Sequence, residues 1–158
     1  MLQKFLKATQ KGFTLIEILV VIGIIAILAA IVIVAINPAK QFAQARNTTR
    51  EANVNAILNA IGQRVADNRG IFAGTFGAYT CPTIAPGPLD IGTNSGLTDL
   101  SCLTPTYIPT GIPVDPTGGT AADTLYTGAV DATGRYTVCA PSHVEAAIPG
   151  STPYCLTR

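Results

Sequence analysis

The chain has 158 residues, of which 48% are hydrophobic, and a formal net charge of +1. This length predicts one domain, or one domain and an additional segment, while a mean hydropathy of +0.40 is too high for an ordinary soluble protein. The excess lies in residues 13–36, and the remainder has the composition of a small domain. Residues 70–158 carry six acidic and two basic residues, a balance that argues against nucleic-acid binding.

The first twelve residues form a short basic segment, which we predict to be a leader that is removed. It contains Lys4, Lys7 and Lys11 and no acidic residue, so the positive-inside rule predicts a cytoplasmic N-terminus. A secretory signal peptide is the alternative. It would need an apolar core of about 7–15 residues followed by a small-residue cleavage site, and the apolar run here is longer.

Residues 13–36 are predicted to form a membrane helix. At about 1.5 Å per residue, 24 residues span about 36 Å, which is enough to cross a bilayer. The only charged residue in this run is Glu17. Ionisable side chains are costly in membrane segments, so this carboxylate needs an explanation. Thr14 and Glu17 have the spacing of a capping box, and a carboxylate in the first helical turn also interacts favourably with the helix dipole.

The string Lys11-Gly12-Phe13-Thr14-Leu15-Ile16-Glu17, followed by the apolar run to Ile36, resembles the N-terminus of type IV pilins and of the pseudopilins of type II secretion. The resemblance implies that a membrane-embedded prepilin peptidase cuts between Gly12 and Phe13 and methylates the new amine of Phe13. It also implies that Glu17 faces the Phe13 amine of a neighbouring subunit in a filament. Cleavage would then permit assembly, because an uncleaved chain has no free amine at this position.

A helix breaker, Asn37-Pro38, follows the membrane segment and predicts a kink or local melting near Pro38. Residues 37–69 are predicted to continue the helix and to end before Gly70, with Gln, Arg and Asn outside a single apolar stripe. This stripe is expected to pack on a sheet, and its members recur at intervals of three and four residues: Val54, Ile57, Leu58, Ile61 and Val65.

Two further features of residues 37–69 concern their surface. Five basic residues stand against two acidic ones, which suggests a basic stalk joined to an acidic head whose opposed charges could help subunits to stack. Ordinary solvated helix faces explain the same charges equally well. The tripeptide Asn47-Thr48-Thr49 matches a glycosylation sequon, and its use would depend on cellular machinery.

Residues 70–158 are predicted to form a loop-rich head with short strands, because they hold 12 of the 15 glycines and 10 of the 11 prolines. The clearest hairpin joins Tyr126–Val130 to Arg135–Ala140, and a last strand is expected at Tyr154–Thr157. The stretch from Pro82 to Ser101 shows almost no periodic signal.

Four cysteines lie in this head and none in the helix, which suggests two disulfides with three possible connectivities. Sequential pairing is favoured because it closes loops of about 20 residues, each stabilising the fold by roughly 3 kcal/mol on the chain-entropy estimate. A zinc site is disfavoured since there is no CxxC pair and only one histidine, His143, which is expected to be a surface side chain. The favoured pairs are Cys81–Cys102 and Cys139–Cys155.

The segment from Tyr107 to Pro116, with the hairpin after it, also resembles major pseudopilins and the pilins similar to them. Secretion pseudopilins usually have Trp-Gly after the Asp-Pro and acidic calcium ligands, whereas Thr117-Gly118-Gly119 follows here and tryptophan is absent from the chain. We expect no metal site in the head, and the alternative is a site for calcium, which takes six to eight oxygen ligands. Aspartate before proline or in a turn also has a purely conformational explanation. The candidate ligands are Asp115, Asp123 and Asp131.

Together these features predict an α+β protein with the pilin fold. Its long N-terminal helix would span the membrane in its first half, be kinked near Pro38, and pack by its second half on a small antiparallel sheet. No catalytic constellation or phosphate-binding loop is recognisable, so we expect neither an enzyme nor a cofactor nor a small-molecule substrate.

The expected function is that of a structural subunit of a type IV pilus-like filament. The alternatives are the major pseudopilin of a type II secretion system and a membrane-anchored binding domain that does not assemble. The resemblance implies four kinds of partner: other copies, the membrane, prepilin peptidase, and an assembly platform driven by a cytoplasmic ATPase. Before assembly the chain would cross the cytoplasmic membrane once with its head outside, and afterwards it would lie in a cell-surface filament.

Overall fold

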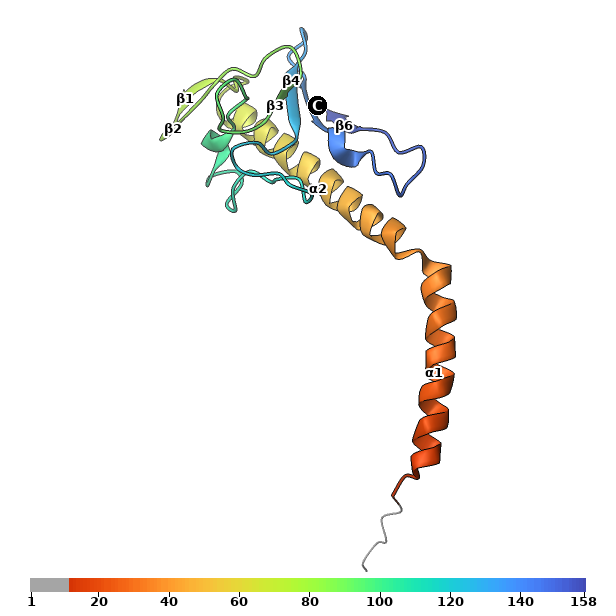
Figure 1. Cartoon of the computed structure of the whole chain (residues 1–158). Coiled ribbons are helices and arrows are strands. Elements are labelled where there is room, and N and C mark those ends of the chain that lie inside the picture. The colour runs from red at the N-terminus through yellow and green to blue at the C-terminus, as the bar shows by residue number, and fades with distance from the viewer. Residues whose placement is uncertain (1–11) are drawn as a thin grey trace, which may run out of the picture. The chain divides into compact units, whose positions relative to one another are not determined.

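The computed structural model describes residues 12–158 (Figure 1). The chain divides after Pro38 into two compact units. The first contains helix α1 (Leu15–Ile36), and the second, residues 39–158, is called the globular unit below. Helix α2 (Pro38–Asp67) leads into the globular unit, which also contains every strand of the described chain.

Helix α1 is long and apolar enough to cross a membrane. Its stretch Leu15–Ile33 has a mean hydropathy of 3.2, and none of that stretch is buried within the described chain. The helix ends at Ile36, where Asn37 adopts a left-handed conformation with φ 48°, which asparagine tolerates better than most residues. Pro38 then opens α2 at a position where its missing N–H does no harm. The disruption expected near Pro38 is therefore a break in the helix at Asn37.

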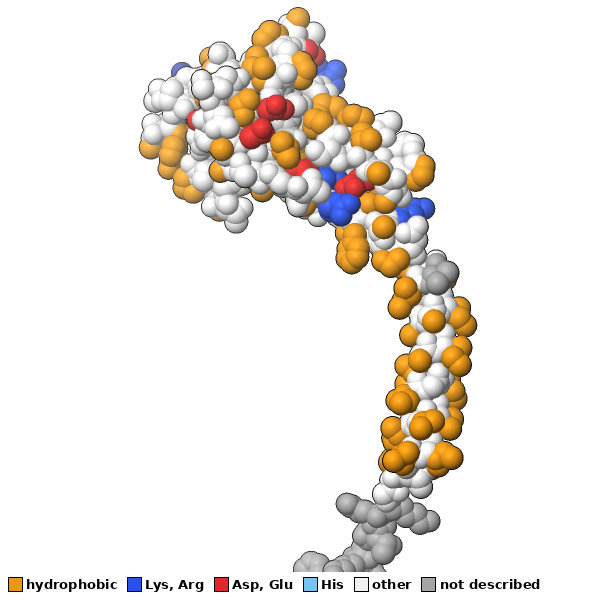
Figure 2. Space-filling model, viewed as in Figure 1, with side chains coloured by type: hydrophobic (Ala, Val, Ile, Leu, Met, Phe, Trp, Pro, Cys, Tyr) orange, Lys and Arg blue, Asp and Glu red, His pale blue; other side chains and the backbone are white. Residues whose placement is uncertain are grey.

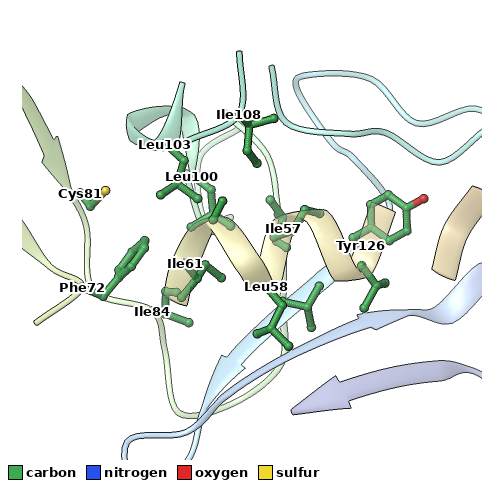
Figure 3. Close-up of a cluster of buried hydrophobic side chains, with 14 of the residues drawn as sticks. Ile57, Leu58, Ile61, Phe72, Cys81, Ile84, Leu100, Leu103, Ile108 and Tyr126 are labelled. Carbon is green, nitrogen blue, oxygen red and sulfur yellow. The ribbon is translucent and has the colours of Figure 1, made fainter. Parts of the chain in front are cut away.

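Helix α2 buries the predicted apolar stripe in the core of the globular unit. Val54, Ile57, Leu58 and Ile61 are buried, while Val65 packs against the core and is partly exposed. Figure 3 shows Ile57, Leu58 and Ile61 of α2 among apolar side chains from segments outside this helix. The same buried cluster also contains Phe72, Ile84, Leu100, Leu103, Ile108, Tyr126 and Val138.

The strands form one four-stranded antiparallel sheet and one separate hairpin. The sheet has the order β3-β4-β5-β6, with β3 at Leu89–Asp90, β4 at Thr127–Val130, β5 at Tyr136–Ala140 and β6 at Tyr154–Thr157. The predicted hairpin and the last strand are thus present, and the α+β class is confirmed. Sequence patterns did not indicate β3 or the separate hairpin, because these strands have two or three residues each. That hairpin pairs β1 (Gly74–Phe76) with β2 (Tyr79–Cys81).

The polar residues of α2 do not all face solvent, contrary to the expectation from the stripe. Arg64 is buried, and its guanidinium donates hydrogen bonds to the carbonyl oxygens of Phe72 (2.9 Å) and Gly74 (2.7 Å). Arg46 donates to Glu145 at 2.6–2.7 Å. These two arginines, and Arg50 as described next, thus bind groups within the globular unit, while the suggestion that a basic stalk helps subunits to stack stays a prediction.

Arg50 is the centre of a buried ionic network. Its side chain is 1% exposed and forms a bidentate ion pair with Asp115, at 2.7 Å from Nε to Oδ2 and 3.2 Å from Nη2 to Oδ1. The same guanidinium donates to Glu145 (2.6 Å), Thr117 (3.1 Å) and Asn47 (2.8 Å). Four of these five hydrogen bonds therefore join α2 to two loops that are distant in the sequence, and the fifth, to Asn47, lies within α2.

The pKa values of both carboxyls follow from this arrangement. Hydrogen bonds from Arg46 and Arg50 lower the pKa of Glu145 from 4.5 to about 2. Burial opposes the ionisation of Asp115, but hydrogen bonds from Arg50 and Thr117 outweigh it and hold the pKa of that carboxyl below its ordinary value. Both carboxylates are therefore ionised at neutral pH and stabilise the folded state.

The stability of the globular unit should fall as the pH drops from about 4.5 to about 2, because the folded-state pKa of Glu145 is depressed. The stabilisation is present above the unfolded pKa and is lost as the pH falls through the folded one. Thermal unfolding of the full chain in detergent should show this slope, and the variant Glu145→Gln should flatten it and unfold at a lower temperature at neutral pH. The matched control is Asp90→Asn, which changes an exposed acid; an equal flattening there would contradict the assignment.

Two side chains named in the sequence analysis lie near this network: His143, expected at the surface, and Asn47 of the sequon. His143 is not a plain surface residue, because its Nε2 lies 3.2 Å from Glu51 Oε1 and its Nδ1 lies 2.8 Å from the Thr152 carbonyl oxygen. Asn47 is buried, and its Nδ2 donates to the His143 carbonyl oxygen at 2.9 Å. The asparagine of the sequon is therefore not accessible for glycosylation in the folded globular unit.

Candidate functional site

The beginning of α1 is a complete capping box. Thr14 is the N-cap residue, and its Oγ1 accepts a hydrogen bond from the Glu17 backbone N–H at 3.3 Å. Glu17 Oε2 in turn accepts hydrogen bonds from the Thr14 backbone N–H (2.8 Å) and from its hydroxyl (2.7 Å). Capping thus accounts for Glu17 within a single chain. The carboxylate is nevertheless exposed, so it keeps the capacity to accept a further donor.

The junction between Gly12 and Phe13 lies just outside the helix. Both residues are exposed and belong to no helix or strand. A Cβ atom placed on Gly12 would meet nothing within 4 Å, and the backbone there is not in the left-handed region. The described fold therefore does not require glycine at position 12, and the peptide bond after it is accessible to an enzyme.

The surface of α1 is apolar and uncovered within the described chain. Figure 2 shows hydrophobic side chains along the visible face of α1, with no basic or acidic group among them. Since such a surface is strongly disfavoured in water, lipid or other protein must cover it. The helix is thus suited to membrane anchoring.

Each of the three calcium candidates binds its own partner within the globular unit. Both Asp115 oxygens bind Arg50, the Asp123 side chain accepts from the Leu125 N–H at 3.0 Å, and Asp131 accepts from the N–H of Thr133 at 2.8 Å. In residues 12–158, no group of three or more His, Cys, Asp or Glu side chains could hold a metal ion. The structure does not bring the three aspartates together.

The four cysteines form two disulfides in the sequential pairing that the loop lengths favoured. Cys81–Cys102 joins β2 to the short 3₁₀ helix Ser101–Leu103, and both cysteines are buried. Cys139–Cys155 joins directly opposed residues of β5 and β6. The second bond closes the connection that carries His143 and Glu145.

Comparison with known proteins gives one match, at the N-terminus. The family model for the prokaryotic N-terminal methylation motif matches residues 7–33, a segment that contains the Gly12–Phe13 junction, Glu17 and most of α1. No curated protein and no solved structure matches the chain. The motif and the α+β fold agree, and the chain therefore carries the signature of the type IV pilins and pseudopilins.

Proposed function

We propose that the protein is a structural subunit of a type IV pilus-like filament. In this account prepilin peptidase cleaves the chain between Gly12 and Phe13 and methylates the Phe13 amine, and the mature chain assembles through α1. The observation that carries the proposal is the methylation motif at residues 7–33, placed on an accessible junction and a fully exposed apolar helix. The role needs no catalytic group, metal or cofactor in the chain itself.

The accessible junction supports cleavage at Gly12. Because the described fold has room for a side chain at position 12, the glycine is best explained by a requirement of the enzyme that binds this segment. A peptidase that must bring a backbone carbonyl close to its catalytic groups favours a residue without Cβ at the scissile bond.

The exposed carboxylate of Glu17 supports assembly by charge pairing. Cleavage creates a cationic amine on Phe13, four residues before Glu17. In a fibre the Glu17 carboxylate of one copy would bind this amine on the next, while the apolar faces of neighbouring α1 helices replace lipid contacts. The pairing satisfies both charges in an apolar core, where an unpaired ion is strongly disfavoured.

The subunit would wait in the cytoplasmic membrane with its globular unit outside. The basic leader with Lys4, Lys7 and Lys11 favours a cytoplasmic N-terminus, and the two disulfides suit an oxidising compartment on the other side. The partners would be further copies of the chain, prepilin peptidase, and an assembly platform with its cytoplasmic ATPase.

A glycine substitution tests the processing step. The variant Gly12→Val should accumulate with its leader attached in membranes, because the added side chain obstructs the peptidase and not the fold. Gly23→Val is the matched control, since a Cβ at Gly23 also meets nothing within 4 Å, and it should be cleaved normally. Intact-mass measurement of the membrane fraction distinguishes the two forms. Normal cleavage of Gly12→Val would contradict the assigned junction.

The state and location of the wild-type chain in the same cells distinguish the alternative functions. Cleaved wild-type chain that stays in the membrane and forms no external filament would favour a secretion pseudopilin, especially if the stability of the globular unit depended on calcium. Wild-type chain that keeps Met1 to Gly12 would favour a membrane-anchored domain that does not assemble.

A further inference from the structure

An exposed apolar patch lies at the start of α2, close along the chain to the membrane helix. Phe42 is 67% exposed although it stands in a helix whose later apolar residues are buried. Val144 is 54% exposed, and its neighbours in the sequence are bound to α2: the His143 carbonyl oxygen to Asn47, and Glu145 to Arg46.

These contacts place Val144 beside the part of α2 that carries Phe42. Phe42 and Arg46 are four residues apart, so they are neighbours on one face of the helix. We call Phe42 and Val144 the α2 entry patch. Figure 2 shows hydrophobic side chains at the surface near the beginning of α2.

The chain itself limits how far this patch can lie from the bilayer. The membrane helix ends at Ile36, and Phe42 comes only one helical turn after the start of α2 at Pro38. Two residues of extended chain and four of helix span at most about 13 Å, whatever the orientation of the two units. The polar zone of a bilayer extends about 5–7 Å beyond its hydrocarbon core. The entry patch is therefore tethered within reach of the lipid headgroups.

The composition of the patch fits the same location. Phenylalanine and other apolar side chains are found on the faces of protein segments that lie in the boundary between headgroups and acyl chains. An exposed phenylalanine and valine in water are otherwise unfavourable, and no other part of the described globular unit covers them.

We propose that, before assembly, the globular unit rests on the outer phospholipid surface through Phe42 and Val144. This contact would restrict the orientation of the globular unit while the subunit waits in the membrane. It would be given up when the subunit leaves the bilayer. The proposal rests on insertion of α1 in a membrane and not on filament assembly.

The lack of tryptophan in the chain allows a direct test. The variants Phe42→Trp and Val144→Trp each carry one tryptophan on the patch. The control Phe76→Trp replaces a residue that is 39% exposed on the β1–β2 hairpin. That hairpin is bound to Arg64 through Gly74, and Arg64 lies 22 residues beyond Phe42, or about 33 Å along α2.

The full chain, leader included, is reconstituted into vesicles of zwitterionic and anionic phospholipid that contain brominated acyl chains. We expect blue-shifted emission and a loss of roughly half the fluorescence for Phe42→Trp and Val144→Trp, and solvent-like, unquenched emission for Phe76→Trp. Solvent-like emission from both patch variants, or equal quenching of all three, would overturn the proposal. The test uses uncleaved chain, so failure of filament assembly would not affect its outcome.

Discussion

Replacing Arg50 with methionine is expected to lower the free energy of unfolding of the globular unit by about 3–5 kcal/mol, the usual effect of removing one partner from a buried ion pair. The Asp115 side chain would remain buried with no counter-charge, and Glu145 would keep only Arg46. Methionine fills similar space, so the loss would report the charge and its hydrogen bonds more than a cavity.

Chemical unfolding of the full chain in detergent, followed by near-ultraviolet circular dichroism, measures this loss. The control Arg135→Met changes an exposed arginine and should alter stability by less than about 0.5 kcal/mol. The double variant Arg50→Met/Asp115→Leu should recover part of the stability, because it removes the orphaned carboxylate. If Arg50→Met were as stable as the control, the network would not be holding the two loops on α2.

The variant Glu17→Val should be cleaved and inserted normally but should not form filaments. A carboxylate and an amine about 4 Å apart attract by about 4 kcal/mol at an effective dielectric constant of 20, before desolvation is counted. Each 1.4 kcal/mol corresponds to a tenfold change in an equilibrium constant. Losing even a third of this attraction would therefore weaken every subunit contact about tenfold. Sheared surface protein, quantified against cleaved protein in the membrane, measures the defect.

A second substitution separates the charge of Glu17 from its capping role. Glutamine at this position can still accept the hydrogen bonds of Thr14 in the capping box, but it carries no charge. We therefore expect Glu17→Gln to be cleaved and to assemble as poorly as Glu17→Val. Normal filaments from Glu17→Gln would show that capping of α1, and not pairing with the Phe13 amine, is what position 17 provides.

Local patterns in the sequence predicted much of this fold. The membrane helix, its break before Pro38 and the apolar stripe on α2 depend on residues close together in the chain. The hairpin of β4 and β5 and the last strand were also predicted from patterns of neighbouring residues. The disulfide pairing was favoured by loop length, and the structure joins Cys81 to Cys102 and Cys139 to Cys155.

The buried ionic network was not predicted, because its partners are distant in the sequence. Arg50 lies 65 residues before Asp115, and Arg46 lies 99 residues before Glu145. One signal was nevertheless present: Arg50 stands four residues before Val54, and Arg64 three after Ile61, so both extend the buried stripe. An arginine in line with an apolar stripe indicates that its guanidinium is buried and bound to hydrogen-bond acceptors. The partner itself depends on how the loops fold.

The N-terminal site was predictable for the opposite reason. Gly12, Phe13 and Glu17 lie within six consecutive residues, so their relation is fixed by the chain and does not depend on tertiary packing. The capping box that joins Thr14 to Glu17 is likewise a feature of one helical turn. The action of a peptidase on this segment and its contacts between copies are not set by one chain, so cleavage after Gly12 and the pairing of Glu17 with a neighbour both stay predictions.

The most direct test of the filament account is mass spectrometry of material sheared from the surface of cells that express the full chain. We expect an abundant peptide that begins at N-methylated Phe13, which would establish cleavage, methylation and export into a fibre together. A sheared fraction without this chain, alongside membranes that hold it with Met1 to Gly12 still attached, would contradict the account.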